Sequence, residues 1–64
     1  MQLVLDDSAY TDRLAAFLRS VGQEPVVAGP DAVEIGGAAE QAEVEVYVRV
    51  WKVLYPDANV KLVD

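Results

Sequence analysis

Residues 43–56, EVEVYVRVWKVLYP, decide the fold of this chain, because their pattern fits two different secondary structures. Polar and apolar residues alternate strictly from Glu43 to Val50, which is typical of a strand with one buried face. The same residues also fit an amphipathic helix, in which one side is apolar. The apolar residues on that side are Val44, Tyr47, Val48, Trp51, Leu54 and Tyr55.

Three features favour the helix. The opposite side is polar, with Gln41, Glu45, Arg49 and Lys52, and a Glu four residues before an Arg stabilises a helix. An unbroken strand of this length would far exceed the usual ~5–6 residues. Pro56 then disfavours helical geometry at the residue before it. We therefore expect a helix over residues 38–55, and a strand over residues 42–52 is the alternative.

The residues before this stretch predict a strand, a helix and a hairpin. Leu3 to Leu5 is an apolar run typical of a buried strand. A helix follows and ends at Gly22, where a left-handed residue is common. Its apolar face has helical spacing and consists of Tyr10, Leu14, Phe17, Leu18 and Val21. Residues 25–28 and 32–35 are predicted strands around a Gly-Pro-Asp turn, and Pro25 indicates an edge strand.

A last strand is predicted over residues 60–63, so the element order is βαββαβ in a single domain of residues 1–64. This order resembles the ferredoxin-like, or α/β-plait, fold of the α+β class. The resemblance implies a four-stranded antiparallel sheet in the order 4-1-3-2 with both helices on one face. Residues 44–56 are also similar to a stretch in short actinobacterial proteins of uncharacterised function.

Composition excludes several classes of function. The net charge is −6, from 11 acidic and 5 basic residues, which disfavours both nucleic acid and an anionic membrane surface. The chain has no Cys and no His, so we expect neither disulfides nor a metal site or other cofactor. It begins without a basic, cleavable leader, and a cytoplasmic location is expected.

Proteins of this fold carry local signatures that can be checked here. Metal carriers have a Cys pair in the first loop, where this chain has Asp6 to Ala9. RNA-binding members have aromatic residues on the central strands, and these strands have none. The resemblance also implies an N-terminal Pro in tautomerases and an early Arg in acylphosphatases, and neither occurs. We therefore expect a protein that is not an enzyme.

Two segments are candidate ligand-binding sites. Asp6, Asp7 and Ser8 follow the first strand, where carboxylates can hold a cation, but no Lys or further acid completes such a site, and capping of the next helix explains these residues. Gly36 and Gly37 precede the second helix, as in loops that hold phosphate. They lack the Lys and Ser/Thr of such a loop, and a simple connection explains them too.

The most informative feature is an excess of apolar surface. On the second helix, Val46, Val50 and Val53 form a further apolar stripe, and Val4 and Val63 are expected on the open sheet face. Such surface on a small chain marks a contact site. The sequence thus predicts a non-enzymatic interaction domain with a protein partner, most simply a homodimer. A small-molecule sensor resembling ACT domains, with its ligand at a dimer interface, is the alternative.

Overall fold

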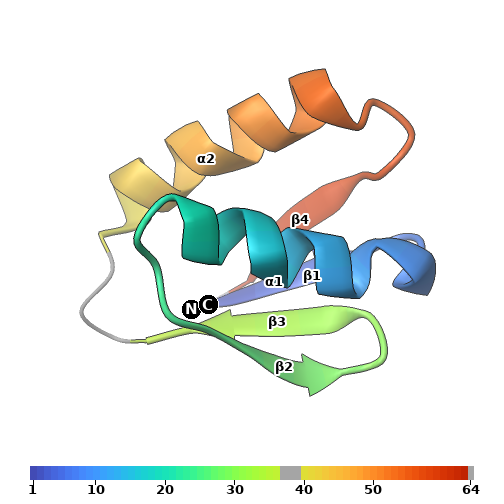
Figure 1. Cartoon of the computed structure of the whole chain (residues 1–64), viewed down its shortest axis with the longest axis horizontal. Helices are drawn as coiled ribbons and strands as arrows, with labels where there is room; N and C mark the ends of the chain where they lie inside the picture. Colours follow the sequence, from blue (N-terminus) through green and yellow to red (C-terminus); the bar gives the residue numbers. More distant parts are fainter. Residues whose placement is uncertain (37–39, 64) are drawn as a thin grey trace.

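The computed structural model describes residues 1–36 and 40–63, which form a four-stranded antiparallel sheet with two helices. The elements are β1 (Gln2–Leu5), a 3-10 turn η1 (Ser8–Tyr10), α1 (Thr11–Ser20), β2 (Pro25–Gly29), β3 (Ala32–Ile35), α2 (Gln41–Leu54) and β4 (Val60–Val63). The strand order β2-β3-β1-β4 is the expected order 4-1-3-2 seen from its other edge. Both helices lie on one side of the sheet and run antiparallel to each other (Figure 1). The ferredoxin-like arrangement is confirmed.

The ambiguous stretch is a helix, so the strand alternative for residues 42–52 is wrong. Val44 and Trp51 lie two turns apart on the inner side of α2 and are both fully buried. The helix ends at Leu54, one residue before the predicted end. It begins at Gln41 and not at residue 38, because the backbone of Glu40 before it is extended; residues 38 and 39 themselves lie outside the described residues.

One residue expected on the core side of α2 lies elsewhere. The Leu54 side chain is 58% exposed, because it projects about 60° round the helix from Trp51. Tyr55, the next residue, packs on the core as predicted, with its ring centre 4.4 Å from that of Trp51. The apolar surface that Leu54 adds lies outside the core.

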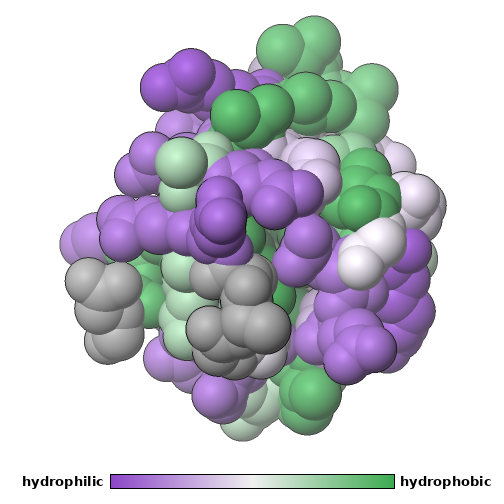
Figure 2. All heavy atoms as spheres, turned by 90° about the vertical axis from the view of Figure 1, so that its left-hand side faces the viewer, coloured by the Kyte–Doolittle hydropathy of each residue, from purple (hydrophilic) through white to green (hydrophobic). Residues whose placement is uncertain are grey.

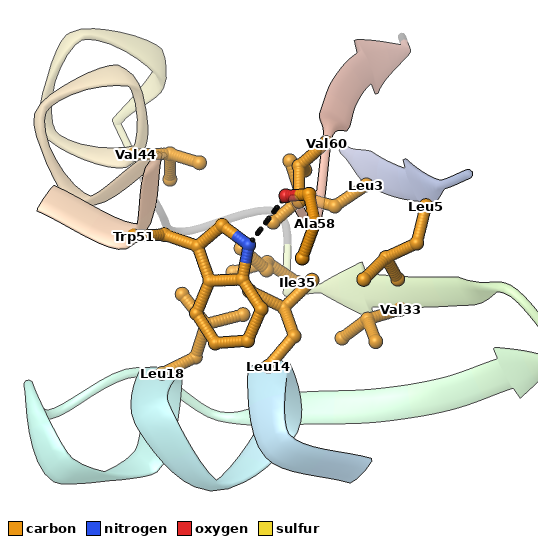
Figure 3. Close-up of a cluster of buried hydrophobic side chains, with 10 residues drawn as sticks. All are labelled: Leu3, Leu5, Leu14, Leu18, Val33, Ile35, Val44, Trp51, Ala58 and Val60. Atoms are coloured by element: carbon orange, nitrogen blue, oxygen red, sulfur yellow. Dashed lines mark hydrogen bonds between the residues drawn. The ribbon is translucent and has the colours of Figure 1, made fainter. Parts of the chain in front are cut away.

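The core lies between the helices and the sheet. Figure 3 shows Trp51 reaching from α2 towards α1 and the strands, with its indole nitrogen bonded to the carbonyl of Ala58. The side chains packed around it come from every helix and strand except β2: Leu3, Leu5, Leu14, Leu18, Val33, Ile35, Val44 and Val60. Thr11, at the start of α1, is also buried, and its hydroxyl donates to the carbonyl of Pro30 at 2.7 Å. This bond ties α1 to the β2–β3 turn.

The predicted chain reversals are confirmed at named residues. Gly22, which follows the C-cap Val21 of α1, has a φ of +88°, a conformation that glycine adopts without strain. Pro25 begins the edge strand β2, and a bulge lies between Val27 and Gly29 in the ladder with β3. Proline and a bulge both hinder the addition of another strand at this edge.

Candidate interaction surface

The outer side of α2 carries a second row of apolar side chains, which we call the α2 stripe: Val46, Val50, Val53 and Leu54. Their exposed fractions are 51%, 44%, 81% and 58%. The spacing of four, seven and eight residues from the first member places all of them on one side of the helix. The sequence predicted the three valines as one row, and the structure adds Leu54.

The two sides of the α2 stripe differ in polarity. On the side away from α1, Glu45 and Lys52 are exposed and polar. On the side towards α1 lie Glu43 and Tyr47, and Gln23, just beyond the end of α1, lies close enough to the Tyr47 hydroxyl to lower its pKa. Figure 2 shows hydrophobic and hydrophilic side chains separated along the upper edge of the molecule, where Figure 1 places α2.

Glu43 is held in place by its neighbour one turn along α2. The Tyr47 hydroxyl donates a hydrogen bond of 2.7 Å to Oε1 of Glu43. This bond raises the pKa of Tyr47, and desolvation and the Glu43 charge raise it further, against a smaller lowering effect of Gln23. The carboxylate is exposed, so it remains accessible to a second donor. A carboxylate therefore lies at the N-terminal end of the α2 stripe.

A cation lies near the C-terminal end of α2. The Arg13 guanidinium, on α1, lies 5.6 Å from the centre of the Tyr10 ring and 5.9 Å from that of Tyr55. The Tyr10 ring in turn contacts those of Tyr55 and Trp51 edge-on. Cation–π contacts favour this position of the guanidinium. Arg13 is thus directed towards the C-terminal end of α2.

The open face of the sheet is less apolar than the outer side of α2. Val4 and Val63 project from it, as predicted, because they alternate with the buried Leu3 and the half-buried Leu62. In the ladders Val4 is paired with Lys61, and Val63 with Gln2. Glu34 is paired with Gln2 on the other side of β1. Polar side chains thus interrupt the apolar ones on this face.

The predicted ligand-binding residues after β1 have structural roles. Asp7 caps the 3-10 turn before α1, because its Oδ1 accepts from the Ala9 amide at 3.0 Å. Asp6 Oδ2 accepts from Nδ2 of Asn59 at 3.1 Å, which joins this loop to the start of β4. Ser8 is exposed. Within residues 1–36 and 40–63, no group of three or more acidic side chains is arranged to hold a metal ion.

The predicted phosphate-type loop is described only at Gly36, and Gly37 lies outside the described residues. A Cβ added at Gly36 would meet nothing within 4 Å. No neighbouring group therefore requires glycine at this position.

Sequence reasoning missed Glu43, Tyr47 and Arg13 as features of this surface. The spacing of four residues between Glu43 and Tyr47 was a usable signal, since such side chains meet on a helix. The spacing of four between Val50 and Leu54 was another. The position of Arg13 carried no such signal, because it depends on how α1 packs against Tyr55.

No family model matches the chain, and no curated protein or solved structure is significantly similar to it. The likeness of residues 44–56 to short actinobacterial proteins thus gains no support from a homologue. Among the helices in the described part of the chain, none has the length and apolar character needed to cross a membrane.

Proposed function

We propose that this protein is a non-enzymatic, self-associating interaction domain whose contact surface is the α2 stripe. The observation that carries the proposal is the row of four large apolar side chains, each at least 44% exposed, on one side of α2. Contiguous apolar surface of this kind is typical of contact sites. A second copy of the chain is the partner that needs no further assumption.

The size of the chain adds support. A domain of 64 residues buries a smaller share of its surface than a large one and is correspondingly marginal in stability. A standard interface takes ~800 Å² from each partner, which is about a fifth of the 3991 Å² surface of the described residues. The four stripe residues are its apolar centre, and Tyr47, Glu43 and the outer side of α1 extend it.

The helix layer is a better contact surface than the sheet. On the open face, a second copy would have to desolvate Glu34 and Lys61 together with the valines, and burying charges without good partners costs free energy. The edge strand β2 begins with Pro25 and contains a bulge, both of which oppose strand addition. These features favour association through α2.

The alternative, an ACT-like sensor, has less support. Its ligand was expected near Asp6 to Ser8 or near Gly36, but the Asp6 and Asp7 carboxylates are bonded to Asn59 and Ala9 of the same chain. Absence of enzymatic activity and a cytoplasmic location both stay predictions.

Sedimentation equilibrium at micromolar concentration tests the proposal. We expect the wild-type chain to sediment above its monomer mass of 6.9 kDa, and Val50→Glu to sediment as the monomer. Val26→Glu is the matched control, because Val26 is 65% exposed but lies on the open sheet face. It should associate as the wild type does. A monomeric wild type, or equal disruption by both substitutions, contradicts the proposal.

A further inference from the structure

We infer that two copies pair with their α2 helices antiparallel, and that Glu43 of each copy forms an ion pair with Arg13 of the other. This inference rests on the proposed self-association through the α2 stripe and adds the orientation of the copies and the residues that select it. The basis is the placement of one carboxylate and one guanidinium at opposite ends of the same side of the stripe.

The two charges cannot neutralise each other within one copy. Glu43 lies in the first turn of α2, and Arg13 lies against Tyr55 just after its last turn. Twelve residues separate Glu43 from Tyr55, which is about 18 Å along a helix. An ion pair requires about 4 Å or less between the charged atoms. Each charge is therefore free to meet a partner on a second copy.

A two-fold axis brings the two ends together. In an antiparallel pair of identical helices, the two-fold axis is perpendicular to both helices. The side of α2 that carries Glu43 then lies on the same side of the interface in both copies, and the N-terminal end of one helix lies beside the C-terminal end of the other. An axis passing near Val50 places Val46 of one copy opposite Leu54 of the other. It also places Glu43 of one copy beside the end of α2 where Arg13 of the other copy lies. Two identical ion pairs then flank the apolar contact.

A parallel pair lacks this complementarity. In a parallel pair the two-fold axis would run along the helices. The side of α2 that carries Glu43 in one copy would therefore lie against the opposite side of α2 in the second copy. The neighbours of Glu43 at that level would be Ala42 and Val46 of the second copy, so Glu43 would meet apolar side chains there and no cation. The antiparallel arrangement also sets the helix dipoles in opposite directions, which is favourable.

Both side chains are positioned in advance. Tyr47 holds the Glu43 carboxylate by its hydrogen bond, and the Tyr10 and Tyr55 rings hold the Arg13 guanidinium. Less side-chain freedom is therefore lost on pairing than for free surface charges. Charges at the margin of an interface contribute to the choice of partner and register more than to affinity. These two residues thus select the antiparallel pair.

Charge reversal tests the inference through homodimers and a heterodimer. Glu43→Arg alone puts two cations together at both contacts, and Arg13→Glu alone puts two anions together. Mixing the two variants restores opposite charges at both contacts of the heterodimer. Each exposed ion pair changes an equilibrium constant by about 1.4- to fivefold, and reversal replaces attraction by repulsion at both contacts, so we expect each variant to self-associate roughly tenfold more weakly than the wild type. The mixture should recover an affinity near the wild-type value.

Two features make this test specific. Glu43→Arg reduces the net negative charge, so a general charge effect would strengthen its homodimer, whereas the inferred contact weakens it. The controls are Glu45→Arg and Lys52→Glu, which make the same kinds of change on the polar side of α2 and should each leave the dissociation constant within about twofold of the value expected from net charge. Circular dichroism confirms that each variant is folded.

The outcomes separate this inference from the proposed function. A wild-type chain that remains monomeric overturns both. A wild-type dimer that is disrupted by Val50→Glu, but whose charge-reversed variants do not prefer each other in the mixture, overturns the antiparallel contact alone. Preferential heterodimers of the Glu43→Arg and Arg13→Glu chains support it.

Discussion

The indole Nε1 of Trp51 donates a hydrogen bond of 3.0 Å to the backbone carbonyl of Ala58, and both residues are almost completely buried. This bond joins α2 to the loop that leads into β4, across seven residues and around Pro56. It satisfies a carbonyl that has no access to water. Trp51 therefore both fills the core and fixes the path of the chain after α2.

Substitution of Trp51 by Phe should destabilise the protein by more than the loss of side-chain volume alone would. The aromatic ring is kept, but the Ala58 carbonyl loses its donor, and an unsatisfied buried group costs ~1–3 kcal/mol. Urea unfolding followed by circular dichroism measures the change in the free energy of unfolding. Phe17→Leu is the control for a smaller ring contact, since Phe17 touches Trp51 but makes no such bond. If Trp51→Phe lowers the free energy of unfolding by less than Phe17→Leu does, this role of the hydrogen bond is contradicted.

Removal of the Asp7 side chain should lower stability, whereas its replacement by Asn should not. Asp7 Oδ1 accepts the Ala9 amide, and loss of such a cap costs ~0.5–2 kcal/mol, while Asn caps about as well as Asp. Thermal melts of Asp7→Ala and Asp7→Asn measure the difference. Addition of Mg²⁺ should leave the melting temperature of the wild type unchanged. A wild type stabilised by Mg²⁺, with Asp7→Asn unresponsive, would identify a metal site instead.

The Tyr47 hydroxyl should lose its proton above the usual pKa of about 10. Its hydrogen bond to Glu43 and the nearby negative charge both favour the neutral phenol and raise the Tyr47 pKa. Since this pKa is higher in the folded than in the unfolded chain, its contribution to stability is complete below about pH 10 and is lost as the pH rises through the folded pKa. The difference in absorbance at 295 nm between the wild type and Tyr47→Phe isolates this titration.

Glu43→Gln is the matched variant for that titration. It keeps an acceptor for the hydroxyl but removes the charge, so the Tyr47 pKa should fall towards its usual value. The same midpoint in the wild type and in Glu43→Gln would show that the carboxylate is not the cause.

The fold was predictable wherever a residue restricts the backbone. Pro56 and the period of the apolar residues identified α2, Gly22 marked the end of α1, and Pro25 identified an edge strand. These signals are local, and they act through backbone geometry alone. The aromatic residues of α2 were predicted as well, because Tyr47, Trp51 and Tyr55 all contact the core. The exposure of Leu54 was not predicted, although its position about 60° round the helix from Trp51 is a local feature of the sequence.

The candidate surface was predictable in its apolar part and not in its charges. Val46, Val50 and Val53 follow from helical spacing, because a two-layer domain needs only one apolar side of a helix. Glu43 and Arg13 become features of the same surface only once α1 and α2 lie side by side. Likewise, the sequence allowed Asp6 and Asp7 either a ligand or a cap. The bonds to Asn59 and Ala9 required the path of the folded chain.

Self-association should strengthen as the ionic strength rises, although its ion pairs weaken. Two copies of net charge −6, with centres about 23 Å apart, as one molecular extent suggests, repel each other by ~6 kcal/mol in water without salt. With Debye lengths of ~30 Å at 0.01 M and ~10 Å at 0.1 M, about half of this repulsion remains at the lower salt concentration and about a tenth at the higher.

The two Glu43–Arg13 contacts oppose this effect only weakly, since exposed ion pairs contribute ~0.2–1 kcal/mol each. The relief of repulsion therefore outweighs the weakening of the ion pairs, and the dissociation constant should fall about tenfold between 0.01 and 0.1 M NaCl. Sedimentation equilibrium across this range measures it. The mixture of Glu43→Arg with Arg13→Glu should show the same trend, since its ion pairs and the product of its net charges are close to those of the wild type. A dissociation constant that rises with salt would mean that attraction between charged groups, and not the α2 stripe, holds the copies together.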